Sequence, residues 1–174
     1  MYTKDLKILF SQDEIQAKIK EIAEKINKDY EGEELCIICV LKGAILFCVD
    51  LVKHLNPPLT IDFIRISTYD GAKSTGKVNN LHIKLPPLEN KNVIIIDDVV
   101  DTAFTANFLV KQIKTEHRVK SVKFVSLLNK KARRTINFEP DYYGFDIDDK
   151  FLVGYGLDNN QYDRNIPFLG YIEV

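Results

Sequence analysis

The fold of this 174-residue chain is decided by one stretch, Val93-Ile94-Ile95-Ile96-Asp97-Asp98-Val99-Val100-Asp101-Thr102-Ala103-Phe104-Thr105. Its first four residues are strongly apolar, as in a buried strand, and the helical pattern of 106–115 follows its last residue. In open α/β sheets ligands bind at the carboxyl ends of the strands, and free N–H groups at a helix N-terminus attract phosphate. The stretch therefore predicts a phosphate-binding turn between a buried strand and a helix.

Strand and helix patterns alternate on both sides of this turn. A capping box, Ser11 to Glu14, opens an amphipathic helix that is expected to end near Tyr30. A second, largely buried helix is expected at 44–54, and strands are expected at 35–40, 61–67, 93–96 and 122–128. This alternation predicts an α/β fold with a parallel-sheet core flanked by helices. Short strands at 142–145 and 151–155 and the N-terminal segment are expected to form a small hood.

Residues 67–80 differ from the rest of the chain. The segment is polar and rich in Gly, Ser, Thr and Lys, with few apolar residues. A long polar segment inside a compact domain is typically a lid or a disordered loop. We expect a mobile lid loop that closes over a site, with a surface loop of no function as the alternative.

Composition sets limits on the kind of protein. The length favours a single domain, 1–174, and the net charge of −1 gives no basic field of the kind that nucleic-acid-binding proteins carry. No apolar run is long enough to cross a membrane, and 1–10 lacks the pattern of a signal peptide, so we expect a cytoplasmic protein. Cys36 and Cys39 form a C-x-x-C inside an apolar strand, where residues three apart face opposite sides. We interpret both as core cysteines.

Three carboxylates stand beside the predicted phosphate turn. Asp97 and Asp98 are adjacent, and Asp101 follows within the turn. Acidic side chains next to a phosphate site are useful when they hold hydroxyl groups, a metal ion or a proton in transfer, and a ribose offers two neighbouring hydroxyls. The alternative is that they only cap the helix, which is plausible for one aspartate and a poorer account of three.

The same stretch resembles the signature that binds 5-phosphoribosyl-1-pyrophosphate (PRPP) in type I phosphoribosyltransferases. That signature has four apolar residues, two acidic residues, two apolar residues and then Asp-Thr-Gly-x-Thr. Further segments resemble those of the hypoxanthine-guanine phosphoribosyltransferases in family order, namely 41–44, 67–69, 126–130, 149–158 and Arg164. The resemblance runs from about residue 40 to residue 165.

This resemblance implies a Mg²⁺-dependent reaction of purine salvage. The phosphoribosyl group of PRPP would pass to hypoxanthine or guanine, giving IMP or GMP and pyrophosphate. The partners would be PRPP and a 6-oxopurine base, without nucleic acid or membrane, in a homo-oligomer, either a dimer or a tetramer. Whether xanthine is also a substrate stays open.

The resemblance also implies a role for each matching residue. Asp101 would be the catalytic residue that manages the proton at purine N7, since the attacking purine must lose a proton. Asp97 and Asp98 would hold the ribose hydroxyls and, with Asp158, serve the metal. The remaining roles are phosphate binding by Thr102, Ala103, Phe104 and Thr105; pyrophosphate binding by Lys42, Gly43 and Arg164; purine binding by Lys130, Phe151, Leu152 and Asp158; and the lid by Ser67, Thr68 and Tyr69.

Two residues depart from the family pattern. Asp97 stands where the family usually has Glu, and Ala103 stands where it has Gly. If the backbone at 103 had a positive φ, an alanine there would be strained. The peptide before Lys42 can be cis in the family, which makes Leu41–Lys42 a candidate. We interpret the basic cluster of 131–134 as a solvated face.

Two other functions compete with this one. A Mg²⁺-dependent phosphatase would use the aspartate pair, but it would leave Lys130 and Phe151 unexplained. A regulator with the same fold that binds RNA would need a basic surface and a degraded site. The retained Asp101 and Asp158 and the net charge near zero argue against it.

Overall fold

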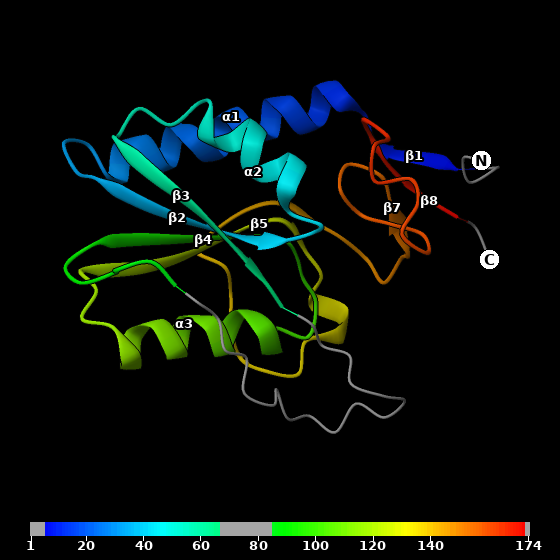
Figure 1. Cartoon of the computed structure of the whole chain (residues 1–174). Helices are drawn as coiled ribbons and strands as arrows, with labels where there is room; N and C mark the ends of the chain where they lie inside the picture. Colours follow the sequence, from blue (N-terminus) through cyan, green and yellow to red (C-terminus); the bar gives the residue numbers. More distant parts are fainter. Residues whose placement is uncertain (1–5, 67–84, 173–174) are drawn as a thin grey trace.

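A parallel five-stranded sheet forms the centre of the molecule (Figure 1). The structure is a computed structural model, and it describes residues 6–66 and 85–172. The strand order is β3-β2-β4-β5-β6, with all four neighbouring pairs parallel. The strands are β2 (Leu35–Leu41), β3 (Leu59–Arg65), β4 (Asn92–Val100), β5 (Ser121–Asn129) and β6 (Tyr142–Asp146). The α/β prediction is confirmed, whereas the expected lid residues Ser67, Thr68 and Tyr69 lie outside the described residues.

Helices cover both faces of this sheet (Figure 1). α1 (Gln12–Asp29) and α2 (Ile45–Val52) pack on one face, and α3 (Phe104–Glu116) packs on the other. The predicted capping box is present, because Ser11 N donates to the Glu14 carboxylate at 2.8 Å and Glu14 N donates to Ser11 Oγ at 3.3 Å. Cys39 belongs to the α1–α2 side of the core and Cys36 to the α3 side, as the strand pattern predicted.

The central strand β4 is longer than the sequence pattern indicated. It runs through both aspartates to Val100, because β5 continues beside it and pairs Asp97 with Ser126 and Val100 with Asn129. Asp97 and Asp98 are therefore part of the strand, not residues that follow it. Their backbones are fixed by the sheet, so the directions of their side chains are set by strand geometry.

The hood is a three-stranded antiparallel sheet in the order β1-β8-β7. It contains β1 (Lys7–Phe10), β7 (Leu152–Val153) and β8 (Leu169–Tyr171). The expected contribution of the N-terminal segment is confirmed. The expectation that 142–145 belongs to the hood is wrong, because β6 extends the core sheet beside β5. A short 3-10 helix, η1 (Lys131–Arg133), lies between β5 and β6.

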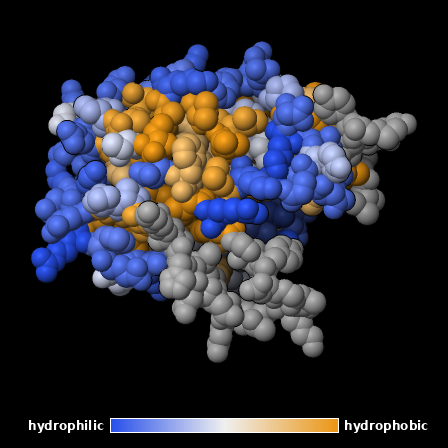
Figure 2. Space-filling model, in the orientation of Figure 1, coloured by the Kyte–Doolittle hydropathy of each residue, from blue (hydrophilic) through white to orange (hydrophobic). Residues whose placement is uncertain are grey.

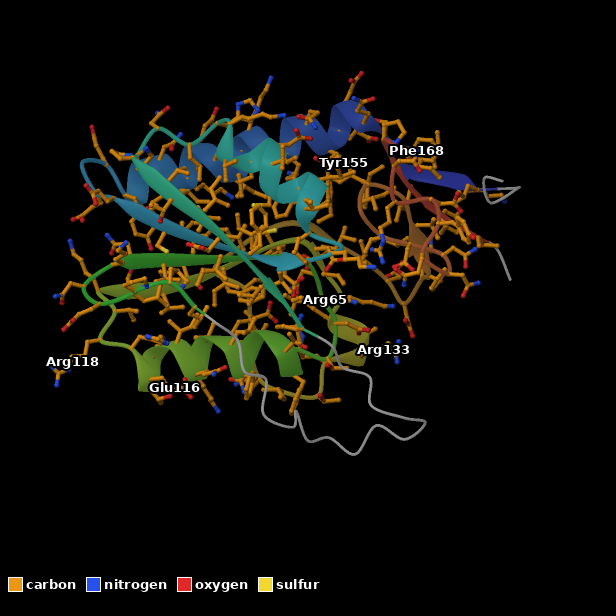
Figure 3. The ribbon with its side chains drawn as sticks, in the orientation of Figure 1. Arg65, Glu116, Arg118, Arg133, Tyr155 and Phe168 are labelled. Atoms are coloured by element: carbon orange, nitrogen blue, oxygen red, sulfur yellow. The ribbon has the colours of Figure 1, made fainter. Side chains whose placement is uncertain are left out.

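Tyr155 ties the hood to the helices of the core, and it lies between α2 and the hood in Figure 3. Its hydroxyl donates to Asp50 Oδ2 of α2 at 2.7 Å, and Gln16 of α1 donates to the same oxygen at 2.8 Å. Burial and the neighbouring Asp50 raise the pKa of Tyr155, so the phenol stays protonated and remains the donor. Among the described residues, no helix has the length and apolar character that a membrane span needs.

Candidate active site

The turn after β4 presents the N-terminus of α3 without a side-chain cap. Ala103, the N-cap residue, has φ 66° and ψ 5°, and the first turn of α3 contains no acidic residue. Thr102 Oγ1 accepts from the Phe104 amide at 3.4 Å, and the carbonyl of Thr102 is held by Thr135. Uncapped amides at the start of a helix are a ready binding place for phosphate. Phosphate binding by residues 102–105 stays a prediction, and the start of α3 is compatible with it.

Ala103 has the positive φ at which alanine is strained. Its side chain is 4% exposed and belongs to the buried cluster under α3. The methyl group thus contributes to the core, and this contact helps to hold the residue in its unfavourable conformation.

Asp97 and Asp98 form a pair of carboxylates at the end of the sheet. Burial, followed by the charge of Asp98, raises the pKa of Asp97 well above its ordinary value. Burial also raises the pKa of Asp98, although hydrogen bonds to its ionised form partly oppose this. Both side chains receive backbone donors, with Asp97 Oδ1 accepting from Asp98 N at 2.9 Å and Asp98 Oδ1 from Val99 N at 3.0 Å. Two close acidic groups with raised pKa values favour a bound donor or cation.

Asp101 lies in the turn with one oxygen unpaired among the described residues. This oxygen, Oδ1, is buried, while Oδ2 is 3.5 Å from the guanidinium of Arg133. A buried acceptor without a donor is costly and is found at sites that await a ligand. Arg133 itself is exposed, as expected for the basic cluster, and it lies at the surface in Figure 3.

Arg134 binds backbone carbonyls of the turn after β4 that contains Asp101. Its guanidinium donates to the carbonyls of Asp101 at 3.1 Å and Val100 at 3.3 Å, to Asn129 Oδ1 at 2.6 Å, and to the carbonyl of Phe138. Its side chain is only 12% exposed. The interpretation of Arg134 as part of a solvated face is therefore wrong. No sequence pattern indicates this contact, because the donor and its acceptors meet only in the folded chain.

The loop after β2 packs tightly between two other parts of the site. Its Leu41–Lys42 peptide is cis. A side chain on Gly43 would overlap the carboxylate of Asp98, and one on Gly156 would overlap the carbonyl of Gly43. Glycine at both positions allows the loop to lie directly between the acidic pair and the 154–158 segment.

The predicted pyrophosphate and metal residues meet beside this loop. Arg164 Nη2 is 2.6 Å from Asp158 Oδ1, and Arg164 Nη1 donates to the carbonyl of Gly156 at 2.7 Å. Lys42 Nζ and Arg164 Nη2 both donate to Gln161 Oε1, at 3.0 and 3.4 Å. Gln161 was not predicted as a site residue. Two cations from opposite parts of the chain thus converge on one point.

The predicted purine residues lie on the other side of Asp101. The backbone of Lys130 is bonded to the carbonyl of Val100 at 2.9 Å, and its ammonium is 2.6 Å from Asp149 Oδ1. This contact lowers the pKa of Asp149. Phe151 is 56% exposed and Leu152 is buried. The exposed ring of Phe151 can stack on a planar base.

The carboxylates fit a magnesium ion that arrives with a phosphate ligand. Within 6–66 and 85–172, no group of three or more His, Cys, Asp and Glu side chains could hold a metal by itself. Mg²⁺ in phosphate chemistry is commonly bound through one or two carboxylates, waters and the substrate phosphates. Asp97 and Asp98 supply such a pair, whereas the oxygens of Asp158 already accept from Arg164 and from the Gln161 amide.

A family model described as the phosphoribosyl transferase domain matches residues 7–160. The chain belongs to the phosphoribosyltransferase family. This phosphoribosyltransferase is 38% identical to the hypoxanthine-guanine phosphoribosyltransferase of Streptococcus thermophilus over 175 residues, which cover 99% of this chain and 97% of that protein. It is also 38% identical to the bifunctional protein TilS/HprT of Listeria monocytogenes, of which it spans 27% of the length.

A solved structure gives the same relationship for the fold. The crystal structure of a hypoxanthine-guanine phosphoribosyltransferase from Bacillus anthracis superposes on this phosphoribosyltransferase with a TM-score of 0.87 and 39% identity. The match covers 97% of both chains. A hypoxanthine phosphoribosyltransferase from Staphylococcus aureus gives a TM-score of 0.88 at 35% identity. The chain thus has the type I phosphoribosyltransferase fold.

Proposed function

We propose that this enzyme transfers the phosphoribosyl group of PRPP to hypoxanthine or guanine, releasing pyrophosphate, in purine salvage. The observation that carries the proposal is the buried Oδ1 of Asp101, which has no hydrogen-bond partner among the described residues. Asp101 lies just before the N-terminus of α3, and the backbone N–H of Lys130 donates to the carbonyl of the neighbouring Val100. A phosphate held by α3 and a base held near Lys130 and Phe151 would bring the base and C1′ of the ribose to this carboxylate.

The roles of the residues follow from their chemistry. Asp101 accepts the proton that the purine loses on attacking C1′, which a positioned carboxylate does well. Lys130 donates to the 6-oxo group of the base and so favours 6-oxopurines over adenine, whose 6-amino group is itself a donor. Asp97 and Asp98 hold the ribose hydroxyls, and their negative charge favours the positive charge that develops on the ring.

The cofactor in this proposal is Mg²⁺, which neutralises the charge of the leaving pyrophosphate when it is bound. Asp97 and Asp98 are adjacent in β4, and burial is the main cause of the raised pKa of each. A bound cation would stabilise their ionised forms. Lys42, Arg164 and the backbone at Gly43 bind the diphosphate on the opposite side. Asp158 keeps Arg164 in place through their ion pair.

The test is turnover of purified protein with Mg²⁺ and PRPP, offering hypoxanthine, guanine, xanthine and adenine separately. We expect nucleotide from hypoxanthine or guanine only when the metal is present, and the xanthine assay defines the substrate range. Asp101→Asn should lower kcat by roughly 10²- to 10⁴-fold, the usual contribution of a general base, with PRPP binding little changed. A folded wild-type protein that converts none of the four bases would refute the proposal.

We also propose that the enzyme is a cytoplasmic homo-oligomer. All three cysteines are free and buried, which suits a reducing compartment. An apolar band, orange in Figure 2, crosses the face over α2 and β3. Its exposed members in these elements are Ile45, Val49, Ile61 and Phe63. Contiguous exposed apolar surface of this kind supports a contact between copies of the chain.

A further inference from the structure

Gln161 joins two cationic side chains that come from opposite ends of the site. Lys42 lies in the loop after β2, and Arg164 lies in the segment between β7 and β8. Both donate to Gln161 Oε1, at 3.0 and 3.4 Å. Because the ammonium of Lys42 and the guanidinium of Arg164 donate to the same oxygen, the two positive charges lie close together and can act on one anion.

The backbone of Gln161 is held in place, so its side chain starts from a fixed position. The backbone N–H of Gln161 donates to Asp158 Oδ2 at 2.8 Å, and the φ angle of Gln161 is 72°. The turn that contains it is closed by reciprocal bonds between Asn159 and Tyr162, at 3.1 and 3.0 Å. The exposed side chain therefore projects from a fixed turn, and its position relative to Lys42 depends on the close packing of Gly156 against Gly43.

The side chain of Gln161 is uncharged, and this affects how strongly Lys42 and Arg164 can attract an anion. Arg164 is already paired with Asp158. Within the described parts of the chain, no carboxylate lies within ion-pair distance of Lys42. A glutamate at 161 would form ion pairs with both cations and would repel a diphosphate. The neutral amide orients the same two cations and leaves their charge available to an anion.

We infer that Gln161 is a positioning residue that sets the affinity of the site for the diphosphate group of PRPP and for free pyrophosphate. The inference rests on the proposed function, since it takes Lys42 and Arg164 as the diphosphate-binding cations. It adds a residue to that site and explains why an amide, and not a carboxylate, bridges them.

The experiment is calorimetric titration of the full chain with inorganic pyrophosphate in the presence of Mg²⁺. Three variants are compared with wild type: Gln161→Glu, Gln161→Met, which keeps length and removes the acceptor, and Asn160→Asp. Asn160 is exposed and adjacent, so the last variant adds the same charge next to the bridge but not within it. Circular dichroism and thermal midpoints confirm that each variant is folded.

We expect Gln161→Glu to weaken pyrophosphate binding by about tenfold or more, the scale of one lost charge-assisted contact. Gln161→Met should weaken it by a smaller factor, and Asn160→Asp should resemble wild type. In turnover assays Gln161→Glu should raise the KM for PRPP and leave the KM for hypoxanthine unchanged, a split that a general loss of structure would not produce.

Two results would overturn the inference. If wild type converts hypoxanthine while Gln161→Glu and Asn160→Asp bind pyrophosphate equally, the role of Gln161 is wrong and the proposed function stands. If wild type binds no pyrophosphate, the inference fails at its premise. Absence of turnover of every base is the separate result that rejects the proposed function.

Discussion

At the scale of single residues, the site contains acidic side chains in surroundings that disfavour their charge. Asp97 and Asp98 lie side by side with raised pKa values, and Asp101 keeps a buried oxygen without a donor. Unpaired buried acceptors and like charges both reduce stability. In the proposed reaction, substrate groups and a cation would offset both costs.

The acidic pair gives a prediction about pH and stability. A carboxyl whose pKa is raised by folding stabilises the folded chain below its ordinary value, 3.8, and this contribution is lost as pH rises through the raised pKa. Asp98→Asn removes the second charge, so it should lessen this loss and stabilise the chain relative to wild type at pH 8 more than at pH 5. Urea unfolding without Mg²⁺ at the two pH values measures this difference.

The same variant should lose turnover, because Asp98 is expected to hold ribose and metal. A gain in stability together with a loss of activity is the signature of a residue kept for function. An equal difference in unfolding free energy at both pH values would contradict the account of the pair.

How far the sequence predicts single residues depends on where their partners lie. Asp101, Thr102 and Lys130 were assigned from motif order, and their roles stay predictions. Asp149, Gln161 and Arg134 were missed, since each acts through a residue that is distant in sequence or through a turn whose geometry the sequence does not specify. Arg134, for example, donates to a carbonyl 33 positions earlier, so its role appears only when the sheet is assembled.

At the scale of elements, one group of polar contacts attaches the segment after β7 to the helices of the core. The Tyr155 hydroxyl, Asp50 and Gln16 connect the 154–158 segment to α1 and α2. The hydroxyl is buried with its ring, so its hydrogen bond to an ionised partner is worth more than an exposed one.

Tyr155→Phe should therefore destabilise the protein by about 1–2 kcal/mol, the loss of one hydrogen bond to a charged group. The ring is retained, so packing changes little. Tyr162→Phe is the matched control, because Tyr162 is 69% exposed. Denaturant unfolding of both variants gives the comparison, and equal stabilities would show that the Tyr155–Asp50 bond does not contribute.

The sequence predicted the long elements, and among the short ones it predicted the strands β6 and β7 but not β8. α1, β2 and β5 have clear periodicity or long apolar runs, and the structure has them within a few residues of their expected bounds. β6 was placed in the hood because a five-residue strand carries no sign of the sheet it joins. β8, with three residues, was not predicted at all.

At the scale of the whole molecule, apolar side chains of β3 are exposed to solvent among the described residues. Ile61 and Phe63 are 40% and 50% exposed on β3, which is an edge strand of the core sheet. The exposed edge and its apolar side chains together form a surface that monomeric proteins usually protect. The outline of the fold was predictable from alternating patterns, but which face stays open depends on strand order, which the patterns do not specify.

Sedimentation velocity tests whether copies of the chain meet at this face. We expect wild type to sediment as a dimer or tetramer and Ile61→Lys to shift towards the monomer. Ile8→Lys makes the same change at a residue that is 59% exposed on the hood, and it should leave the mass unchanged. If Ile61→Lys keeps the wild-type mass, the interface lies elsewhere.

The pairing of β1 with β8 has a consequence for the order in which the site can be built. β8 is the middle strand of the hood, so neither β1 nor β7 has a partner before it is present. During synthesis β1 emerges before the core sheet and cannot pair until β8 has been made. The strands of the core sheet, α3 and the turn before α3 all precede β7, to which Leu152 belongs. A growing chain can thus complete the proposed phosphate side first, and the proposed base side is finished only when β8 pairs with β7.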